Sequence, residues 1–347
     1  MKKPVLHAPE STMPTLSEIA KKAKVSTAVV SRIVNNDKTL RVSDETRERV
    51  KKIVVETGYT PNRAARSLRS TETGFLAMVV HDATNPVYAE ITRGAHEAAT
   101  RAGKSILLID ASVGGQAVTS VQELISGRGI DGLILQAADE KTDGLIATAA
   151  RSNIPMVQLQ ARIDAQFPIV ALPDYEATRL ATQSLIDDGH TRIACIATRA
   201  GLTFTEERIR GWRSALADAG LIERLGDLVY SDPNLTGGKA ALNAVRSNGT
   251  TATGLVCCNV LTAIGAMQTA RELSIGIPGD LSIVAIHDSP FAEYCFVPLT
   301  TVRMPLFELG QEAIKMLISP SRPDHKADVV LAQPPVLVKR ASSARRL

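Results

Sequence analysis

Four side chains in one short segment are suited to contacting the edges of base pairs. Thr27, Ala28, Ser31 and Arg32 fall on the outward face of a predicted helix. An arginine can donate two hydrogen bonds to one guanine, and the small side chains of threonine and alanine can contact the methyl group of thymine. Side chains of this kind near the start of a helix are typical of recognition helices in the major groove. The segment therefore predicts binding to double-stranded DNA.

Three predicted helices between residues 15 and 60 would hold this face in place. Thr15 followed by Glu18 is the pattern of a helix start in which each side chain satisfies a backbone donor. Ser26 and Ser43 are good caps for two further helices, and Gly58 predicts the end of the third. Apolar residues at helical spacing supply the inner faces: Leu16, Ile19, Ala20, Ala23, Val29, Val30, Ile33, Val34, Val50, Ile53 and Val54. The pattern predicts a helix-turn-helix domain, which follows a disordered arm at residues 1–14.

Charge is distributed unevenly along the 347 residues. Residues 1–72 hold 15 Lys and Arg against 8 Asp and Glu, whereas the rest of the chain holds 25 against 28. The overall charge of +4 therefore conceals a basic amino-terminal segment on a slightly acidic body. A basic domain of this kind is suited to phosphate contacts.

Three runs, TLSEIAKKAKVSTAVVSRIVNN, RVSDETRERV and GYTPNRAARSLR, together resemble the lactose repressor family of bacterial transcription regulators, LacI/GalR. A looser similarity continues to about residue 340. The resemblance implies a sequence-specific DNA-binding regulator, most often a repressor, and not an enzyme. The family commonly has Gly where Lys24 stands, which predicts a strained turn here.

The resemblance also implies a hinge helix within residues 61–72 that forms on DNA. Leu68 would insert between base steps and kink the duplex, although packing of Leu68 against the body remains an alternative. The DNA-contacting residues implied in this way are Thr15, Ser26, Thr27, Ala28, Ser31, Arg32, Asn35, Asn62, Arg63, Ala65, Arg66 and Leu68.

Residues 73–340 alternate short apolar runs with helix-length segments. The runs FLAMVV, SILLI, GLIL and PMVQL, and then RIACIA, GLVCC and LSIVAI, read as buried parallel strands. This predicts an all-α helix-turn-helix head and hinge helix joined to an α/β body. The body should have two doubly wound parallel-sheet lobes, and the family resemblance implies that they are similar to periplasmic binding proteins. We expect lobe one at about 73–172 and 302–325, lobe two at about 173–299 and 326–340, and a loose basic tail at 341–347.

The family resemblance places an effector between the lobes. The implied effector-binding residues are Asp82, Asn85, Tyr88, Arg162, Arg208, Asn259 and His287, with Asp174 and Asp288 at further motif positions. Simpler roles remain open: Tyr88 packing in the core, Asp174 capping a helix, and Arg162 pairing with a carboxylate.

The sequence departs from the family where the effector is expected. The family commonly has an acidic residue at His287 and Asp at Val260, and Asp232 lies near a position where many relatives have an aromatic ring. With Arg162, Arg208 and a protonated His287 facing the cleft, a sugar acid or other carboxylate is a plausible effector alongside a neutral sugar.

Other classes of protein lack support in the sequence. Gly127, Gly129 and Gly132 form Gly-x-Gly-x-x-Gly, but a predicted helix precedes them and a strand follows, the reverse of a dinucleotide site. No nucleophile motif, metal-ligand spacing or cofactor site is recognisable. An enzyme with a DNA-binding head and an exported solute-binding protein are the weaker alternatives.

The four cysteines, Cys195, Cys257, Cys258 and Cys295, lie mostly within apolar runs and read as reduced core residues. A redox switch at Cys257 and Cys258 is the alternative. We expect a cytoplasmic homodimer without a membrane partner, because no signal peptide or apolar heptad tail is recognisable. A corepressor-dependent regulator or an activator of the same fold is the alternative to a repressor that an inducer releases.

Overall fold

The computed structural model describes residues 14–35, 37, 39–59, 72–113, 115–136, 143–319 and 328–346. The chain divides into two compact units, residues 1–73 and residues 74–347, here called the head and the body. Of the predictions made above, the arm before Pro14 and the hinge residues Asn62, Arg63, Ala65, Arg66 and Leu68 lie outside the described residues. No helix in the described ranges is long and apolar enough to cross a bilayer.

The described residues of the head form three helices: α1 (Leu16–Ala23), α2 (Thr27–Val34) and α3 (Asp44–Thr57). The predicted starts are confirmed. The Thr15 hydroxyl accepts a hydrogen bond from Glu18 N at 3.3 Å, and Thr15 N donates to the Glu18 carboxylate at 3.0 Å. Ser26 and Ser43 cap the next two helices. The buried residues of the small core come from all three helices and the loop before α3: Ile19, Ala20, Ala23, Val30, Ile33, Leu40 and Val50.

The turn between α1 and α2 has the strained backbone predicted for Lys24. Lys24 has φ 54° and ψ 44°, in the left-handed region, and its N–H donates to the carbonyls of Ala20 and Lys21. Because a Cβ disfavours this conformation, the turn would suit glycine better than lysine. Gly58, with φ 64°, ends α3 in the same way, as predicted.

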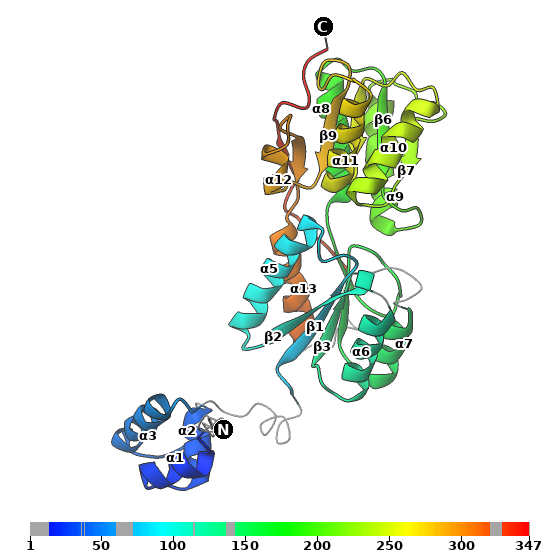
Figure 1. The fold of residues 1–347 in the computed structure, drawn as a ribbon. Coiled ribbons are helices and arrows are strands. Elements are labelled where there is room, and N and C mark those ends of the chain that lie inside the picture. Colours follow the sequence, from blue (N-terminus) through cyan, green and yellow to red (C-terminus); the bar gives the residue numbers. More distant parts are fainter. Residues whose placement is uncertain are drawn as a thin grey trace, which may run out of the picture. The chain divides into compact units, whose positions relative to one another are not determined.

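Six strands form the sheet of the first lobe of the body. The strands are β1 (Phe75–Val80), β2 (Ser105–Asp110), β3 (Gly132–Leu135), β4 (Met156–Leu159), β5 (Ile169–Ala171) and β11 (Val329–Val330). Their order is β11-β5-β4-β3-β1-β2, and every pairing is parallel. The helices of this lobe are α5 (Pro86–Arg101), α6 (Gly115–Ser126), α7 (Asp143–Ser152) and α13 (Leu306–Ile318), with a 3-10 turn η1 at Ala111–Val113. Figure 1 shows α5 and α13 on one face of this sheet and α6 and α7 on the other.

The second lobe repeats this arrangement. Its strands are β6 (Ile193–Ala197), β7 (Leu228–Tyr230), β8 (Gly254–Cys257), β9 (Ser282–Ile286), β10 (Thr300–Arg303) and β12 (Val336–Val338). Their order is β12-β10-β9-β8-β6-β7, with only β12 antiparallel among the described pairings. Its helices are α8 (Asp174–Asp187), α9 (Thr203–Asp218), α10 (Leu235–Ser247), α11 (Val260–Glu272) and α12 (Pro290–Glu293). All seven apolar runs singled out in the sequence are strands, and the two doubly wound lobes are confirmed.

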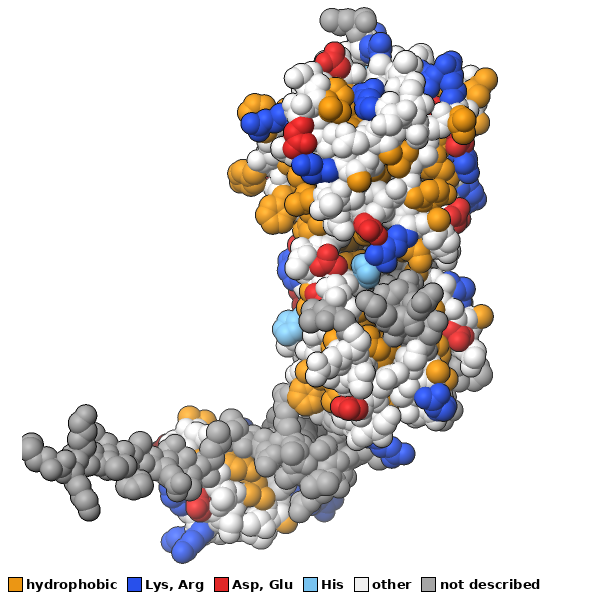
Figure 2. Space-filling view, turned by 45° about the vertical axis from the view of Figure 1, so that its right-hand side comes forward, with side chains coloured by type: hydrophobic (Ala, Val, Ile, Leu, Met, Phe, Trp, Pro, Cys, Tyr) orange, Lys and Arg blue, Asp and Glu red, His pale blue; other side chains and the backbone are white. Residues whose placement is uncertain are grey.

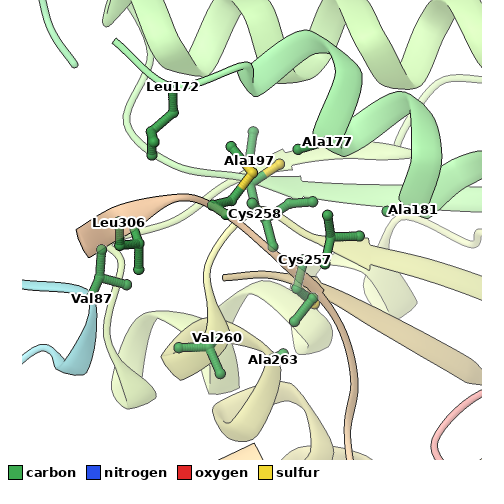
Figure 3. Close-up of a cluster of buried hydrophobic side chains, with 14 of the residues drawn as sticks. Val87, Leu172, Ala177, Ala181, Ala197, Cys257, Cys258, Val260, Ala263 and Leu306 are labelled. Atoms are coloured by element: carbon green, nitrogen blue, oxygen red, sulfur yellow. The ribbon is translucent and has the colours of Figure 1, made fainter. Parts of the chain in front are cut away.

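A continuous apolar core joins the lobes beside their junction. Figure 3 shows Val87 and Leu306, from the first lobe, near Ala197, Cys258 and Val260, from the second. Within the first lobe α5 and α13 cross closely, because a Cβ on Gly94 would lie 1.9 Å from the Phe307 carbonyl oxygen. A side chain at this glycine would therefore force the two helices apart.

Two features of the predicted domain layout need correction. The chain crosses between the lobes after β10, which ends at Arg303 in the second sheet, and again after β11, which pairs with β5 in the first sheet. The boundaries expected at 302 and 326 therefore move to about 304 and 332. The described part of the tail is also not loose: Ser342 is buried, its hydroxyl donates to Ile283 O at 2.6 Å and accepts from Thr300 N at 2.8 Å. The tail thus supplies hydrogen-bond partners for the backbone groups of Ile283 and Thr300. Its polar sequence did not indicate this role.

Candidate functional site

One face of α2 carries the predicted DNA-reading residues of the head. Thr27, Ala28 and Arg32 are exposed and Ser31 is half-buried, so the first two turns of α2 present the predicted side chains. Asn35, the carboxy-terminal cap, is exposed, and its amide nitrogen donates to Ser31 O at 2.7 Å. Thr15 and Ser26 are exposed as well, but their hydroxyls cap α1 and α2. The predicted residues of the head that the structure describes are thus exposed or half-buried, as contact with DNA requires.

The Arg32 side chain is held by the loop that follows α2. Its Nε donates to Oδ2 of Asp37 at 2.7 Å, and its Nη2 donates to the Thr39 hydroxyl at 2.8 Å. Hydrogen bonds from Thr39 and Arg32 lower the pKa of Asp37 to about 2, so the carboxylate is ionised at neutral pH. These two bonds occupy the edge of the guanidinium formed by Nε and one hydrogen of Nη2. The other edge, formed by Nη1 and the second hydrogen of Nη2, can donate to a base.

The pocket of the body lies where the carboxyl ends of both sheets meet. His81, Gln136 and Gln160 follow β1, β3 and β4, whereas Thr198 and His287 follow β6 and β9. Parallel sheets bind ligands at this edge. The pocket and its open mouth enclose about 600 Å³. Its described lining residues are His81, Asn85, Val87, Tyr88, Gln136, Gln160, Thr198, Arg199, Leu202, Phe204, Arg208, Pro233, Asn259 and His287. Figure 2 shows basic, acidic and histidine side chains meeting at the junction of the lobes.

Arg208, from α9, is the centre of the polar network in the pocket. Its side chain is 2% exposed, and its Nε and Nη2 both lie 2.7 Å from Oδ1 of Asp174. Its Nη1 donates to the Cys258 carbonyl at 2.6 Å, and its Nη2 lies 3.0 Å from Nε2 of His287. The Phe204 ring lies 5.1 Å from the guanidinium carbon. A buried charge needs such partners, and Asp174 supplies the balancing carboxylate, although burial raises its pKa against the effect of Arg208.

His287 is not the protonated histidine that the sequence suggested. The side chain is buried, and burial together with the charge of Arg208 holds its pKa well below the usual value. His287 has φ 73°, and Gln160, which also lines the pocket, has φ 63°. Strained non-glycine residues are common at ligand sites, because the surrounding structure must hold them in place. The hypothesis of a carboxylate effector therefore loses its argument from a positively charged His287.

Five of the seven predicted effector residues line the pocket: Asn85, Tyr88, Arg208, Asn259 and His287. Asp82 does not, because its carboxylate accepts hydrogen bonds from the Thr84 N–H and hydroxyl in the loop before α5. Arg162 also lies away from the described lining, where its side chain pairs with Asp328 at the start of β11. The alternative of an ion pair thus holds for Arg162. Asp174 does not cap α8 but is the helix's first residue and pairs with Arg208.

Sequence reasoning missed several polar residues of the pocket. Gln136, Gln160, Thr198 and Arg199 come directly after predicted strands, and this position was the available signal. Arg199 donates to Asp232 at 2.8 Å, whereas Asp232 itself is not among the described lining residues. Burial raises the pKa of Tyr88, which also hydrogen bonds with Gln136, to about 12, so Tyr88 is neutral.

Two other motifs do not contribute to the pocket. The Gly127–Gly132 run follows α6 and enters β3, as expected, so it cannot offer a helix start to a phosphate. The four cysteines are free thiols, and Cys195 Sγ lies 3.8 Å from Cys258 Sγ in the core. The hydrogen bond with Cys258 and burial raise the pKa of Cys195, and burial raises the pKa of Cys257, so neither is a ready nucleophile.

A helix-turn-helix head and a two-lobed body with a pocket between its sheets define an effector-controlled DNA-binding regulator. Residues 15–62 match the model of bacterial regulatory proteins of the lacI family. Residues 73–336 match the model of periplasmic binding proteins and the sugar-binding domain of that family. The chain belongs to the LacI family, and it is a transcription regulator, not an enzyme.

Individual relatives agree with this assignment. The ribose operon repressor of Haemophilus influenzae is 32% identical over 95% of this chain and 98% of its own length. The structure of the regulator CelR in complex with cellobiose is 28% identical, with a TM-score of 0.71 over 95% of this chain and 99% of its own. The lac repressor dimer bound to operator and an anti-inducer is 26% identical, with a TM-score of 0.80 over 96% of this chain and 100% of its own.

Proposed function

We propose that the protein is a homodimeric repressor that acts in the cytoplasm, where two heads bind half-sites of a near-palindromic operator. The observation that carries the proposal is that one chain joins the exposed reading face of α2 to the pocket around Arg208. The operator-bound dimer of the lac repressor supports the dimeric state, and the cellobiose complex of CelR supports a sugar-type effector. Two-fold symmetry of the protein would be matched by symmetry of the DNA site.

In the head, the base edges are contacted by Thr27, Ala28, Ser31 and Arg32. The DNA backbone beside them is contacted by Thr15, Ser26 and Asn35. In the hinge, Asn62, Arg63, Ala65, Arg66 and Leu68 contact the minor groove. The effector, a sugar or sugar acid, binds Asn85, Tyr88, Arg208, Asn259 and His287. These assignments follow from the family resemblance and from the exposed or pocket-lining positions of the described residues.

An aromatic patch on the second lobe is our candidate for part of the dimer contact. The patch consists of Phe291, Tyr294 and Phe296, which are exposed on and beside α12. Next to it lies a groove formed by α11 and two loops, with apolar lining residues Ile264, Met267, Ile275, Ile277 and Val297. Hydrophobic side chains are visible on the surface of the upper lobe in Figure 2. Exposed aromatic clusters are characteristic of protein interfaces, and the occupant we propose is a second copy of this chain.

Binding of the effector changes the relative orientation of the two lobes. That change alters the affinity of the protein for the operator. Hydrogen bonds that cross between the lobes include those from the Asn85 amide to Pro233 O, at 3.4 Å, and from Arg162 N to the Thr203 hydroxyl, at 3.4 Å. A ligand that binds both lobes would shift such contacts. Linkage then requires operator and effector to change each other's affinity by the same factor.

Selection of bound sequences from random duplex DNA tests the proposal. The full-length protein is used at fixed, near-physiological salt, because affinity for DNA depends steeply on salt. Enrichment of a near-palindrome is expected. Enrichment of single half-sites alone would contradict the dimer. A parallel selection with sugars and sugar acids added shows whether the effector releases DNA or is needed for binding, which separates an inducer from a corepressor.

A further inference from the structure

The Arg208–His287 contact determines where the imidazole of His287 carries its proton. The distance between Arg208 Nη2 and His287 Nε2 is 3.0 Å. A guanidinium has only donors, so Nε2 of the histidine must accept this hydrogen bond. A neutral imidazole with an accepting Nε2 carries its hydrogen on Nδ1. The contact therefore selects the Nδ1–H form of His287.

Nδ1 of His287 is a donor without a partner. It is buried, and no hydrogen-bond acceptor reaches it within the described part of the chain. The residue lines the pocket and its side chain is 2% exposed. Since a buried N–H that lacks a partner is costly, an unpaired donor on a residue that lines a ligand pocket points to a group that the ligand satisfies.

Neighbouring ionisable groups hold His287 in the neutral form. Arg208 from α9 faces Nε2 directly, and the carboxylate of Asp174 from α8 is already bonded to that guanidinium. A second proton on Nε2 would set one N–H against another. The other titratable residues of the described lining are Tyr88, which is neutral, His81, and Arg199, which is paired with Asp232 at the mouth. The positive charge of Arg208, which contacts Nε2, thus opposes protonation of His287.

The donors of the residues that line the pocket with His287 favour a particular kind of ligand oxygen. A hydroxyl oxygen can accept a hydrogen bond, but its own hydrogen then needs an acceptor nearby. Arg208, which is bonded to Nε2 of the same ring, offers only donors. Asn259 also lines the pocket, and its Oδ1 accepts from Leu261 N at 2.8 Å while its amide N–H groups bind no other described residue. An oxygen without a hydrogen meets these donors without conflict.

We propose that His287 is a specificity-determining hydrogen-bond donor that selects effectors presenting a hydrogen-free oxygen, the carboxylate or carbonyl oxygen of a sugar acid, lactone or keto sugar. The inference rests on the proposed function only in taking this pocket as the effector site. The selectivity comes from a neutral donor beside a paired arginine, not from a charged histidine. Binding through His287 therefore involves no proton uptake by its ring.

The protonation of His287 is measurable on the ligand-free, full-length protein. Two-bond ¹H–¹⁵N correlation spectra distinguish the ring nitrogens, and His287→Asn identifies the signal by its loss. We expect protonated Nδ1, unprotonated Nε2 and no titration between about pH 5.5 and 8, the range in which an ordinary histidine changes charge. A protonated Nε2, or a ring that titrates in this range, overturns the proposal.

Ligand preference is tested with matched pairs of probes: D-gluconate and D-glucose, D-galactonate and D-galactose, and D-ribonate and D-ribose, with the corresponding lactones. Calorimetry on the full-length protein should show an acid or lactone binding more tightly than its aldose. His287→Asn keeps a donor near the place of Nδ1, and His287→Asp replaces it by an acceptor. Both residues tolerate a positive φ, so both variants should fold. We expect His287→Asp to weaken the acid by about tenfold or more, the effect of one hydrogen bond left unmade, and His287→Asn to weaken it less.

The outcomes separate this inference from the proposed function. An aldose that binds more tightly than its acid and lactone, and releases operator, overturns the inference while leaving the regulator intact. A panel in which no probe binds overturns both the sugar-type effector and the ligand class proposed here. Equal losses in His287→Asn and His287→Asp would show that ring shape, not the donor, determines the preference.

Discussion

Arg32 donates to the Asp37 carboxylate at 2.7 Å, so the arginine expected to read a base is held by a residue five positions further along the chain. Asp37 in turn accepts hydrogen bonds from the Thr39 N–H and hydroxyl, at 2.8 and 2.7 Å. The loop after α2 thus orients the guanidinium before DNA arrives. Such pre-ordering lowers the entropy that the side chain loses on binding.

Replacing Arg32 should therefore change base preference. Arg32→Ala is expected to cost about 1–3 kcal/mol at one base pair of each half-site, because a bidentate contact with guanine is lost. Asp37→Ala should weaken the same base preference but reduce affinity less, since it frees the guanidinium without removing it. Affinities for the operator and for each single-base variant, at one salt concentration, measure both effects. A uniform loss over all sequences would instead identify a phosphate contact.

The low pKa of Asp37 defines the pH range over which the Arg32–Asp37 contact stabilises the head. Its folded pKa of about 2 lies below the unfolded value of about 3.9. The stabilisation is fully present above the unfolded pKa and is lost as the pH falls through about 2. Asp37→Asn should therefore lower the stability of the head at pH 7, and the difference from wild type should shrink in acid. Thermal unfolding of both proteins between pH 7 and pH 2 measures this; a difference that persists at pH 2 would refute a role for the ionised carboxylate.

Lys24 offers a test of the turn between α1 and α2. Lys24→Gly should stabilise the head by about 1 kcal/mol, because glycine adopts the left-handed backbone without the Cβ clash. Lys24→Ala removes the charge but keeps the Cβ, so it is the matched control and should not stabilise. Amide hydrogen exchange of Ile19 and Val30, both buried in the head core, follows the unfolding of this unit. Equal stabilisation by both substitutions would point to charge rather than backbone strain.

A local sequence pattern reveals some features of the fold and of the site but not others. The caps at Thr15, Ser26 and Ser43 and the strands β1 to β4, β6, β8 and β9 were predicted because each depends on neighbouring residues in the sequence. Arg208 and Asn259 were found through family motifs. The partners of Arg208 were not predicted, since Asp174, Cys258 and His287 reach it from three different elements.

The wrong predictions share a physical cause. Arg162 follows a turn at Gln160, which has a positive φ, and pairs with Asp328 instead of lining the described pocket. A sequence does not show such a turn at a glutamine. The charge of His287 likewise depends on burial and on Arg208, which is 79 positions away. The tail was misread because Ser342 and Ser343 satisfy groups of β9 and β10 that only the folded lobe brings near.

Leu68 carries the prediction for the hinge, which lies outside the described residues. Leu68→Ala should lower affinity for the operator and reduce its bending, while nonspecific binding changes little, because an apolar wedge acts only at an unstacked base step. Gel mobility of operator fragments with the site at the centre or at the end reports the bend. Unchanged bending would exclude the wedge and favour packing of Leu68 against the body.

The aromatic patch provides the test of the dimer. Tyr294 and Phe296 are 83% and 89% exposed, and the guanidinium of Arg271 lies 5.5 Å from the Phe296 ring. Phe296→Asp places a charge within the proposed apolar contact, so sedimentation should show monomers at concentrations where the wild type is dimeric. Leu225→Asp is the matched control, because Leu225 is 100% exposed in the loop before β7 and lies outside the patch. Since a monomer binds only one half-site at a time, the Phe296 variant should also lose preference for the full operator over a half-site. A Phe296→Asp protein that stays dimeric would assign the dimer contact to another surface of the body, whereas monomers from both variants would point to a general effect of added charge.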